Sequence, residues 1–581
     1  MLTTEMRLTP TMRVALVAAS ALTAASASYV PNLALVAAAS ASYVPDLDGV
    51  GTETPYADLV AAMPNVTAQR FVQGAHFLEN FNHHEAKRSM VAAAEADPDC
   101  AMCWWGVSAS LGPYLNAPFF TNASDLAEAK FAADRAAALA DAPKAAAIAE
   151  AAAARYACNV SLASQTAAFE QYSDLLADAH GADRSDDDVA TLYAESLLLL
   201  DCDFAGYHFY DMVDGALAPT PRVRKALAAL RAVVGRSAHP LAEHLLIHAT
   251  EETAPGFGTP GGAADGERSA DLLAAQFEGS AAQHLIHMSS HTYLRVGRYA
   301  AGAAANERAS ARDAAYLAGG LLPYGVGHDL VFLAFSAAMA GMNATASAAA
   351  TRARAAYAAA PDRPDGPDGS VAWHYPALVH VRFGAWDEVA AALAPPPRPW
   401  PLQAVLEQYA TGLSAFHRGD GAGASAAYAT LQAAAARLPA DDDAPTDGQR
   451  GADVLRNVSF AANATLFAAL LPDRCASAAV LRAAAKVQET WTYDEPPLWH
   501  LPLRQCEGAA WLACGRPRDA TAAFSADFAT FPENAWSLAG LLRAAPGDAG
   551  LEKRFGAASA HADVAISSPC PALEAGKSGG F

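Results

Sequence analysis

Histidine is concentrated in one part of this 581-residue sequence, with a spacing typical of helices. Six of the 17 His residues lie between positions 239 and 291. His244 and His248 are four residues apart, and Glu251 follows three residues later. A second row has offsets of three and four: His284, His287 and His291. Residues at such offsets lie on one face of a helix, so the sequence predicts two helices that each carry a row of imidazoles.

Rows of imidazoles on neighbouring helices favour a metal site. Two His four residues apart on a helix can bind one ion while a second helix completes the coordination. Nitrogen donors, with or without a carboxylate, suit Cu, Fe, Zn or Ni. We therefore expect a transition metal ion, most simply Cu, Fe or Zn, bound by these candidates: His244, His248, His284, His287, His291 and His328. So many candidates would also allow a dinuclear site.

Carboxylates accompany the His rows. Glu251 shares the face of His248, where it could be a ligand, orient a ligand or act as a catalytic general base. Asp329 directly follows His328 and could add a carboxylate to the site. Two other interpretations of the rows stay open: a buried network of hydrogen-bonded His, and a site for haem or another ligand. No C-x-x-C-H motif occurs, which disfavours covalently bound haem.

The remaining chemistry of the sequence is sparse. His83 and His84 are expected in an exposed turn between helices, and four isolated His receive no role: His76, His374, His380 and His500. Cys100 and Cys103 have the spacing of a redox or metal pair, but no second pair exists, so structural thiols or a local disulfide are favoured. The segment Tyr493–Trp499 places two Pro after two acids, which predicts a rigid turn packed by Trp. Phosphate-binding loops, G-x-S-x-G and H-E-x-x-H are absent.

Helices must hold the His rows in place, and the sequence contains a repeat that is typical of helix pairs. In the stretch 70–98, small and apolar residues match the 34-residue tetratricopeptide pattern: Gly74, Phe77, Ala86, Met90, Ala93 and Pro98. The same register returns near the C-terminus: Gly508, Trp511, Gly515, Ala520, Phe524 and Pro532. We therefore expect an all-α, tetratricopeptide-like solenoid of stacked antiparallel helix pairs over residues 46–565. Four Gly-, Pro- or Asp-rich breaks are interpreted as insertions between helices: Thr253–Glu267, Pro361–Ser370, Pro395–Pro401 and Ala440–Asp447.

Composition supports an all-α fold and argues against nucleic-acid binding and membrane spans. The sequence is rich in Ala, a strong helix former, and 53% hydrophobic. Its 61 acidic and 39 basic residues give a net charge of −22 without basic clusters, so nucleic-acid binding is not expected. Beyond the N-terminal region no apolar run is long enough for a transmembrane span, which is about 18 residues or more.

The two ends of the chain are expected to lie outside the solenoid. Residues 1–45 resemble a targeting segment, with Arg7 and Arg13 before the apolar stretch Val14–Ala25 and small residues at a cleavage-like site. The motif at Ala25–Pro31 is repeated at Ala39–Pro45, which is similar to a bipartite signal for the plastid of an alga. Residues 566–581 are expected to form a flexible tail.

Glycosylation sequons point to the secretory pathway as the main expectation. Of 12 Asn, six stand in N-x-S/T: Asn65, Asn122, Asn159, Asn343, Asn457 and Asn463. This excess predicts a secreted or secretory-pathway glycoprotein. Eight Cys are compatible with disulfides in that compartment.

Three stretches together resemble a known group of proteins. They are His239–Glu251, His284–Tyr299 and Tyr493–Trp499, with the patterns HxxxHxxE, HLxHMxxH and YDEPPxW. These are similar to tetratricopeptide-repeat proteins of bacteria and algae, over roughly Ala68 to Ala539. The resemblance implies the fold and little about activity. Ser289 stands where the group tends to have Pro, Asp329 where it tends to have Asn, and a Gly/Pro-rich insertion follows Glu251.

Three functions follow as hypotheses. The first is a metalloprotein, an oxidoreductase or hydrolase, with its metal on the inner face of the solenoid and a small molecule as substrate. The second is a scaffold that binds a protein or peptide partner in a concave groove, as helical repeats often do. The third is a metal-storage or delivery protein, which would bind metal without turnover.

Overall fold

The chain is helical along nearly all of its described length in the computed structural model, which describes residues 54–574 except 158, 204–205, 215, 254–261, 278–281, 326, 360–366, 397–399, 439–447 and 492. The first half contains α2 (Ala57–Val60), α3 (Asn65–Glu79), α4 (His83–Ala96), α5 (Ala101–Leu111), α6 (Ala123–Leu139), α7 (Pro143–Arg155), α8 (Leu162–Ala182), α9 (Asp187–Leu199), α10 (Pro221–Val234), α11 (Pro240–Glu251), α12 (Glu267–Gln276), α13 (Gln283–Arg295) and α14 (Tyr299–Ala318). The second half contains α15 (His328–Met339), α16 (Asn343–Ala359), α17 (Pro367–Phe383), α18 (Trp386–Ala392), α19 (Gln403–His417), α20 (Gly421–Ala435), α21 (Gly448–Leu470), α22 (Arg474–Gln488), α23 (Leu503–Ala513), α24 (Pro517–Asp527), α25 (Ala535–Ala544) and α26 (Ala549–Ala558).

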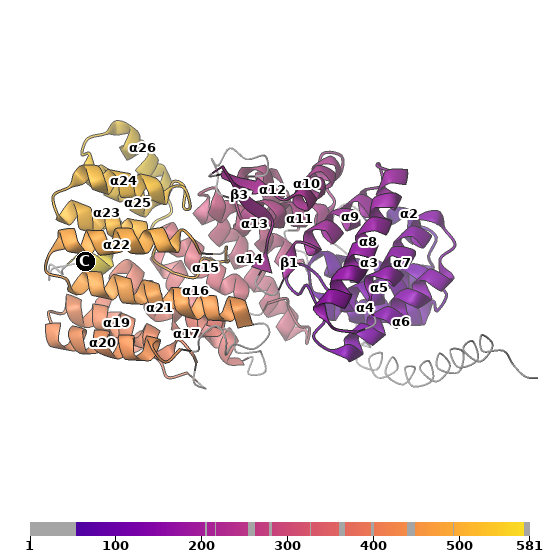
Figure 1. Cartoon of the computed structure of the whole chain (residues 1–581), viewed down its shortest axis with the longest axis horizontal. Coiled ribbons are helices and arrows are strands. Elements are labelled where there is room, and N and C mark those ends of the chain that lie inside the picture. The colour runs from indigo at the N-terminus through magenta and orange to yellow at the C-terminus, as the bar shows by residue number, and fades with distance from the viewer. Residues whose placement is uncertain are drawn as a thin grey trace, which may run out of the picture.

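From α3 onward these helices form antiparallel pairs. Each odd-numbered helix packs against the even-numbered helix that follows it, and most odd-numbered helices also contact the next odd-numbered one. The pairs stack from one end of the molecule to the other (Figure 1). The expected all-α, tetratricopeptide-like solenoid is confirmed.

Small residues allow the helices of a pair to approach closely, as the repeat pattern predicted. A Cβ atom on Gly74 would lie 2.8 Å from the Met90 side chain across the α3–α4 interface. Gly508 lies against the ring of Phe524 in the same way, across α23 and α24. Ala86 and Ala93 are fully buried. Ala and Gly therefore set the helix-to-helix distance in both repeats.

The solenoid curves so strongly that its first pair returns to its fifth. Helix α3 contacts α11, although about 165 residues separate the bonded groups of Glu79 and His244. The turn after α3 is tied to α13, because Asn80 donates to the Gln283 side chain at 3.0 Å and accepts from the Leu285 backbone at 3.1 Å. This closure brings the C-terminal end of α3 over the inner face that carries the His rows.

Two short β-hairpins interrupt the helices between α9 and α10. The strands β1 (Cys202–Asp203) and β2 (Gly206–Tyr207) pair antiparallel, as do β3 (Tyr210–Val213) and β4 (Ala216–Pro219). These strands were not predicted from the sequence. They matter because the first hairpin carries Tyr207 toward the His rows.

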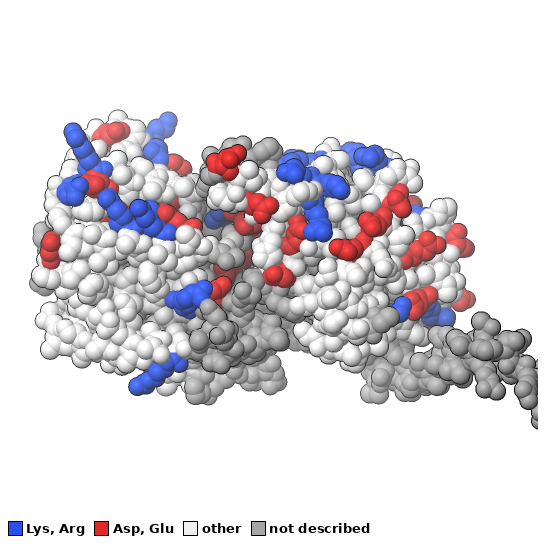
Figure 2. Space-filling model, viewed as in Figure 1, with Lys and Arg blue, Asp and Glu red and all other residues white. Residues whose placement is uncertain are grey.

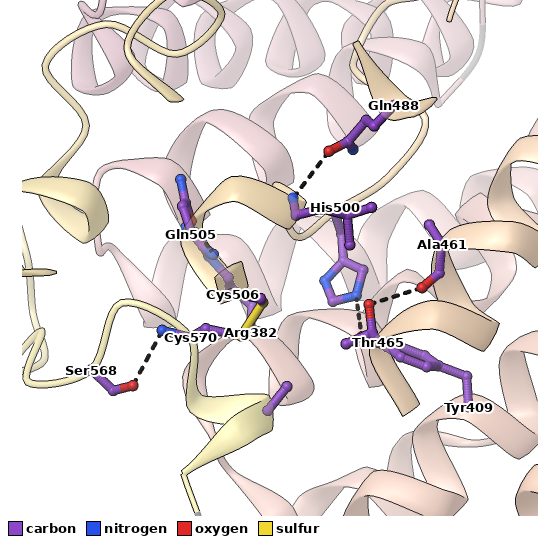
Figure 3. The surroundings of a disulfide bond; sticks show 12 residues. Arg382, Tyr409, Ala461, Thr465, Gln488, His500, Gln505, Cys506, Ser568 and Cys570 are labelled. Carbon is purple, nitrogen blue, oxygen red and sulfur yellow. Dashed lines mark hydrogen bonds between the residues drawn. A yellow bond between two sulfur atoms is a disulfide. The ribbon is translucent and has the colours of Figure 1, made fainter. Parts of the chain in front are cut away.

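Cysteines join parts of the chain in three places. Cys100 and Cys103 form a local disulfide, which agrees with the structural interpretation of that pair. Cys475 bonds to Cys514, and Cys506 bonds to Cys570 (Figure 3). Among the described cysteines, Cys202 is a buried free thiol.

The C-terminal segment differs from the flexible tail that we expected to begin at residue 566. Cys570 is fixed to α23 by its disulfide, and Ile566, Ala572 and Leu573 are buried. Residues 575–581 and the expected targeting segment 1–45 lie outside the described residues. Of the four predicted insertions, Ala440–Asp447 lies wholly outside them and the other three lie partly outside them. Within the described part of the chain, every helix is too short or too polar to cross a membrane.

Candidate metal centre

Three consecutive inner helices carry the candidate ligands. Pro240 occupies the first turn of α11, and His239 caps that helix by accepting from the Ala242 backbone at 3.4 Å. Helix α13 follows one pair later. Helix α15 begins directly at His328, after Gly327 with φ of 89°, a left-handed conformation that favours Gly. Because inner helices of successive pairs lie side by side, both His rows and His328 face one interior.

The six predicted His side chains form two adjacent clusters of three. The ring nitrogens of His244, His248 and His284 lie within 4.8 Å of one another, and the same holds for a second set: His287, His291 and His328. The two clusters adjoin, since the rings of His284 and His287 are 5.4 Å apart. A third group, which shares members with both, adds carboxylates: His248, Glu251, His291 and Glu495. These side chains are positioned to hold metal ions.

In the first cluster, hydrogen bonds fix two of the three rings by one nitrogen and leave the other nitrogen without a partner in the described chain. His244 Nδ1 lies 2.8 Å from the backbone oxygen of Glu79, and His248 Nδ1 lies 2.7 Å from Glu251 Oε1. These oxygens only accept, so each Nδ1 carries the proton and each Nε2 presents a lone pair. Neither Nε2 has a hydrogen-bond partner among the described residues, and neither ring nitrogen of His284 has one. Metal-binding His are typically oriented by such outer hydrogen bonds.

The second cluster is oriented by similar bonds. His287 Nδ1 lies 2.6 Å from Asn306 Oδ1 and 3.3 Å from Asp329 Oδ1. His291 Nδ1 lies 2.6 Å from a carboxylate oxygen of Glu251 and 2.6 Å from one of Glu495. The Nε2 atoms of His287 and His291 are 2.8 Å apart. Two lone pairs at that distance require a cation, whether a proton or a metal ion, between or beside them.

Burial and charge keep three of these imidazoles neutral. Burial lowers the pKa of His244, His284 and His287, and neighbouring imidazoles lower it further. Burial also acts to lower the pKa of His291, but the carboxylates of Glu495 and Glu251 raise it above its ordinary value. In the protein without metal, His291 therefore carries the proton shared with His287. Neutral imidazole is the form that binds metal, so three of the candidate ligands have the required charge at neutral pH.

The acids around the clusters differ in charge. Burial acts to raise the pKa of Glu251, but His248 and His291 hold it below its ordinary value, so Glu251 stays ionised. Burial raises the pKa of Asp329, whose Oδ2 has no partner within the described chain. Glu251 lies between the clusters, with one oxygen on His248 and the other on His291. Glu251 therefore orients one imidazole of each cluster.

Aromatic side chains enclose the imidazoles. The Phe81 ring lies 4.2 Å from that of His244 and stacks on His248, while Phe332 stacks on His291 at 4.7 Å. Tyr324 lies 4.1 Å from His284 by ring centroids. The clusters are thus shielded from bulk water by apolar surfaces, which strengthens electrostatic interactions inside.

Several contributors to the site were not predicted. Glu495 belongs to Tyr493–Trp499, which we interpreted only as a rigid turn, yet it pairs with His291. Asn306, on α14, and Tyr207, whose hydroxyl is 3.5 Å from His248 Nδ1, were not considered. The only sequence signal for Glu495 was its place in a motif that resembled the His-bearing group. By contrast, Asp329 lies beside the His as expected.

The His residues outside the two rows lie elsewhere. His83 is half-buried, not exposed as expected, because its ring stacks on Tyr114 at 4.1 Å and its Nδ1 lies 3.1 Å from the Ser110 oxygen. His84 is exposed. His239 pairs with Asp188 at 3.3 Å, away from the clusters.

Comparisons with known proteins support no closer assignment. No protein-family model matches the chain, and no curated protein matches it significantly. Solved structures with similar helical arrangements include the APC/C hetero-tetramer Cut9-Hcn1, at 11% identity over 87% of this chain and 85% of that chain, with a TM-score of 0.25. Yeast Tom70 has 12% identity over 84% of this chain and 98% of its own, with a TM-score of 0.26. The fold assignment therefore rests on the helix pairs described above, and the function on the site.

Proposed function

We propose that this protein is a helical-repeat metalloprotein whose two three-His clusters bind a pair of transition metal ions. One observation carries the proposal: four buried ring nitrogens of His244, His248 and His284 lack partners within the described chain, while outer bonds orient two of these rings. Buried polar atoms are almost always hydrogen-bonded, so such a concentration of exceptions favours a missing ligand. A purely hydrogen-bonded His network would leave these atoms unsatisfied.

An oxidoreductase with copper is the form of this proposal that the donor set supports best. Six imidazoles form the two clusters, while Glu251 and Glu495 approach Nδ1 of His291, the side opposite its contact with His287. Nitrogen sets bind Cu²⁺ more tightly than the other divalent first-row ions. Iron or zinc would be found by the same measurement. When bound, a redox metal would supply electron transfer, and the chain supplies a dry, oriented pocket of ligands.

Glu251 is proposed to position ligands rather than act as a general base. Both of its oxygens accept from imidazole Nδ1 atoms, at 2.7 Å from His248 and 2.6 Å from His291. A general base needs an oxygen within reach of the substrate proton. The role of catalytic residue is therefore less well supported for Glu251 than that of orienting both clusters.

The test is elemental analysis of the purified full-length chain after expression with copper, iron and zinc in the medium. Two ions per chain are expected. His284→Ala and His328→Ala should each leave one ion, and the double variant His244→Ala, His287→Ala should leave none. His500→Ala, which removes a buried His outside the clusters, should keep both. Trace metal that is the same in the wild type and the double variant would overturn the proposal.

The same measurements separate the two rival functions. A storage or delivery protein would contain the metal but show no turnover with any oxidisable substrate. A scaffold for a protein or peptide partner rests on the stacked inner helices alone, and it would be favoured if the chain binds no metal. Metal content and turnover together therefore assign the class.

A secretory route for the protein is also proposed. Three disulfides join described cysteines, and such bonds persist in oxidising compartments. The sequon residues Asn65, Asn122 and Asn159 are exposed, so glycans could attach there. A mass shift on enzymatic deglycosylation of the protein from its natural source would support this route, and unmodified sequons would favour the plastid alternative.

A further inference from the structure

A large cavity adjoins the second His cluster but not the first. Its volume is about 650 Å³, which lies within the range of small-molecule sites. Its wall includes His328 of the second cluster and Glu495, which contacts His291. No His of the first cluster is found among the described residues of the wall. A molecule in this cavity would therefore meet the second cluster directly and would be separated from the first.

Three hydrogen-bonded side chains stand between the cavity and the first cluster. We name them the tyrosine link: Tyr207 on β2, Asn116 in the loop between α5 and α6, and Tyr324 in the loop between α14 and α15. All three line the cavity. The Tyr207 hydroxyl donates to Asn116 Oδ1, and Asn116 Nδ2 donates to the Tyr324 hydroxyl at 2.6 Å. These two bonds join three distant parts of the chain into one continuous wall.

Both ends of the tyrosine link lie against the first cluster. The Tyr207 hydroxyl is 3.5 Å from His248 Nδ1, and the two rings meet edge to face at 5.7 Å. The Tyr324 ring lies 4.1 Å from that of His284 by ring centroids. His248 and His284 both carry ring nitrogens without partners in the described chain. The link therefore covers these nitrogens on the side of the cavity.

The link is built so that its bonds break without unfolding the core. Asn116 is exposed, and Tyr207 and Tyr324 are half-buried, so their polar groups gain water when the two bonds break. Leu115, the neighbour of Asn116, is 2% exposed and fixes the backbone of the loop in the core. Rotation of the three side chains is therefore enough to open the wall.

The charged groups along the cavity are acidic. Asp203, Asp494 and Glu495 line it, whereas no Lys or Arg is found among its described lining residues. Acidic side chains also lie along both sides of the hollow between the halves of the molecule (Figure 2). Walls of one charge concentrate ions of the opposite charge. The cavity therefore favours the entry of metal cations.

We propose that this cavity is the entrance to the metal centre and that the tyrosine link is a gate on the first cluster. Metal ions and small molecules reach the second cluster directly, and they reach the first only when the link opens. The inference deepens the proposed function and rests on it, because it assigns contact with substrate to the second cluster. The three gate residues are not metal ligands.

Chemical labelling of the full-length, metal-free protein tests the gate. Diethyl pyrocarbonate modifies the neutral imidazoles that it reaches, and mass spectrometry of peptides gives the rate at each His. His328, on the cavity wall, should be modified first, and His244 and His284 about tenfold more slowly. Asn116→Ala removes both bonds of the link, so it should raise the rates at His244 and His284 about tenfold and leave His328 unchanged.

Matched variants separate an open gate from a loosened fold. Tyr324→Phe keeps the ring and removes one bond, so it should raise the two rates about threefold. Thr121→Ala changes the cavity wall outside the link and should behave like the wild type. His500, which is buried outside the clusters, should stay protected in every variant.

Three labelling results would overturn the inference. In the first, His244 and His284 of the wild type are modified as fast as His328. In the second, Asn116→Ala leaves both of them protected. In the third, His500 becomes labelled together with them, which would show that the variant loosens the whole fold.

Release of metal to EDTA from the loaded protein separates this inference from the metal proposal. Two phases are expected: a fast one that is absent in His328→Ala, and a slow one that is absent in His284→Ala and about tenfold faster in Asn116→Ala. If two ions leave at a single rate, the gate is overturned while the metal centre stands. If the chain binds no metal, the proposed function fails, and the labelling, which needs no metal, still decides whether the link closes the first cluster.

Discussion

A buried polar network around Asp527 and the two His clusters differ in how completely their polar atoms are hydrogen-bonded. In the C-terminal half, Asp527 Oδ2 accepts from Gln505 at 2.9 Å, from Asn534 at 2.8 Å and from Ser537 at 2.7 Å. Gln505 in turn accepts from Arg382 at 2.7 Å, beside the Cys506–Cys570 disulfide (Figure 3). Of these groups, only Arg382 Nε lacks a partner in the described chain.

The His clusters are equally buried but far less paired. His244, His248 and His284 leave four ring nitrogens without partners among the described residues. A fully hydrogen-bonded network stabilises the fold by itself, whereas unpaired buried polar atoms destabilise the fold until a ligand binds to them. Complete hydrogen bonding therefore marks a structural network, and unpaired buried polar atoms mark a binding site, whatever the residue types.

The largest effect is expected in the paired cluster. Asp527→Ala removes the acceptor of three donors and a carboxylate near the buried Arg382 guanidinium, which should cost about 3–5 kcal/mol of unfolding free energy. Chemical denaturation followed by circular dichroism measures this loss. Asp519→Ala on the same helix is the control, because half-exposed ion pairs such as that with Arg516 contribute about 0–1 kcal/mol. Equal losses in the two variants would contradict a special role for the Asp527 network.

The stability that the His clusters contribute should depend on bound metal. At a free metal concentration one hundred times the dissociation constant, each bound ion should stabilise the wild type by about 2.7 kcal/mol. The variant His244→Leu, His287→Leu should gain nothing from metal. Without metal it should lose only about 1–3 kcal/mol, because the donors to the Glu79 and Asn306 oxygens are lost while ring nitrogens that had no partner or shared a proton are removed as well. Thermal unfolding with and without metal gives both numbers, and a large loss in the metal-free variant would show a structural role instead.

A smaller effect, on metal affinity, should distinguish the two His clusters from each other. Asn306→Leu removes the acceptor that orients His287, and outer bonds of this kind are worth about 10- to 100-fold in metal affinity. A competition titration with a chromogenic chelator should show one weakened site and one unchanged site. Glu251→Gln should weaken both sites, since Glu251 bonds to one His of each cluster. If Asn306→Leu weakens both sites equally, the clusters do not bind separate ions.

Much of this arrangement could be predicted from local patterns. Helical offsets placed five His on two faces, and the tetratricopeptide pattern placed those faces on successive inner helices. The position of Glu495 could not be predicted in this way, because over 200 residues separate it from His291, and only the curvature of the solenoid brings them together. The return of α3 to His244 is equally long-range. The hairpin that carries Tyr207 has strands of two residues, too short for a periodic signal.

His239 provides the smallest and most selective test, because it belongs to the sequence cluster but is a paired residue. Burial acts to lower its pKa, but the hydrogen bond to Asp188 raises the pKa of His239 above its ordinary value of 6.5. Burial acts to raise the pKa of Asp188, and His239 and Lys144 hold it below its ordinary value of 3.8. The His239–Asp188 pair therefore contributes its full stabilisation of the fold between pH 3.8 and pH 6.5.

That contribution is lost in both directions of pH. It falls as the pH drops through the lowered pKa of Asp188, and as the pH rises through the raised pKa of His239. His239→Gln should thus lower the free energy of unfolding near pH 6 by less than about 1 kcal/mol and flatten the decline of that free energy above pH 6.5. Metal content should stay at two ions per chain, because His239 is a paired His on the same helix as the ligands. Loss of an ion in His239→Gln would mean that hydrogen-bond pairing does not distinguish the structural His from those that bind metal.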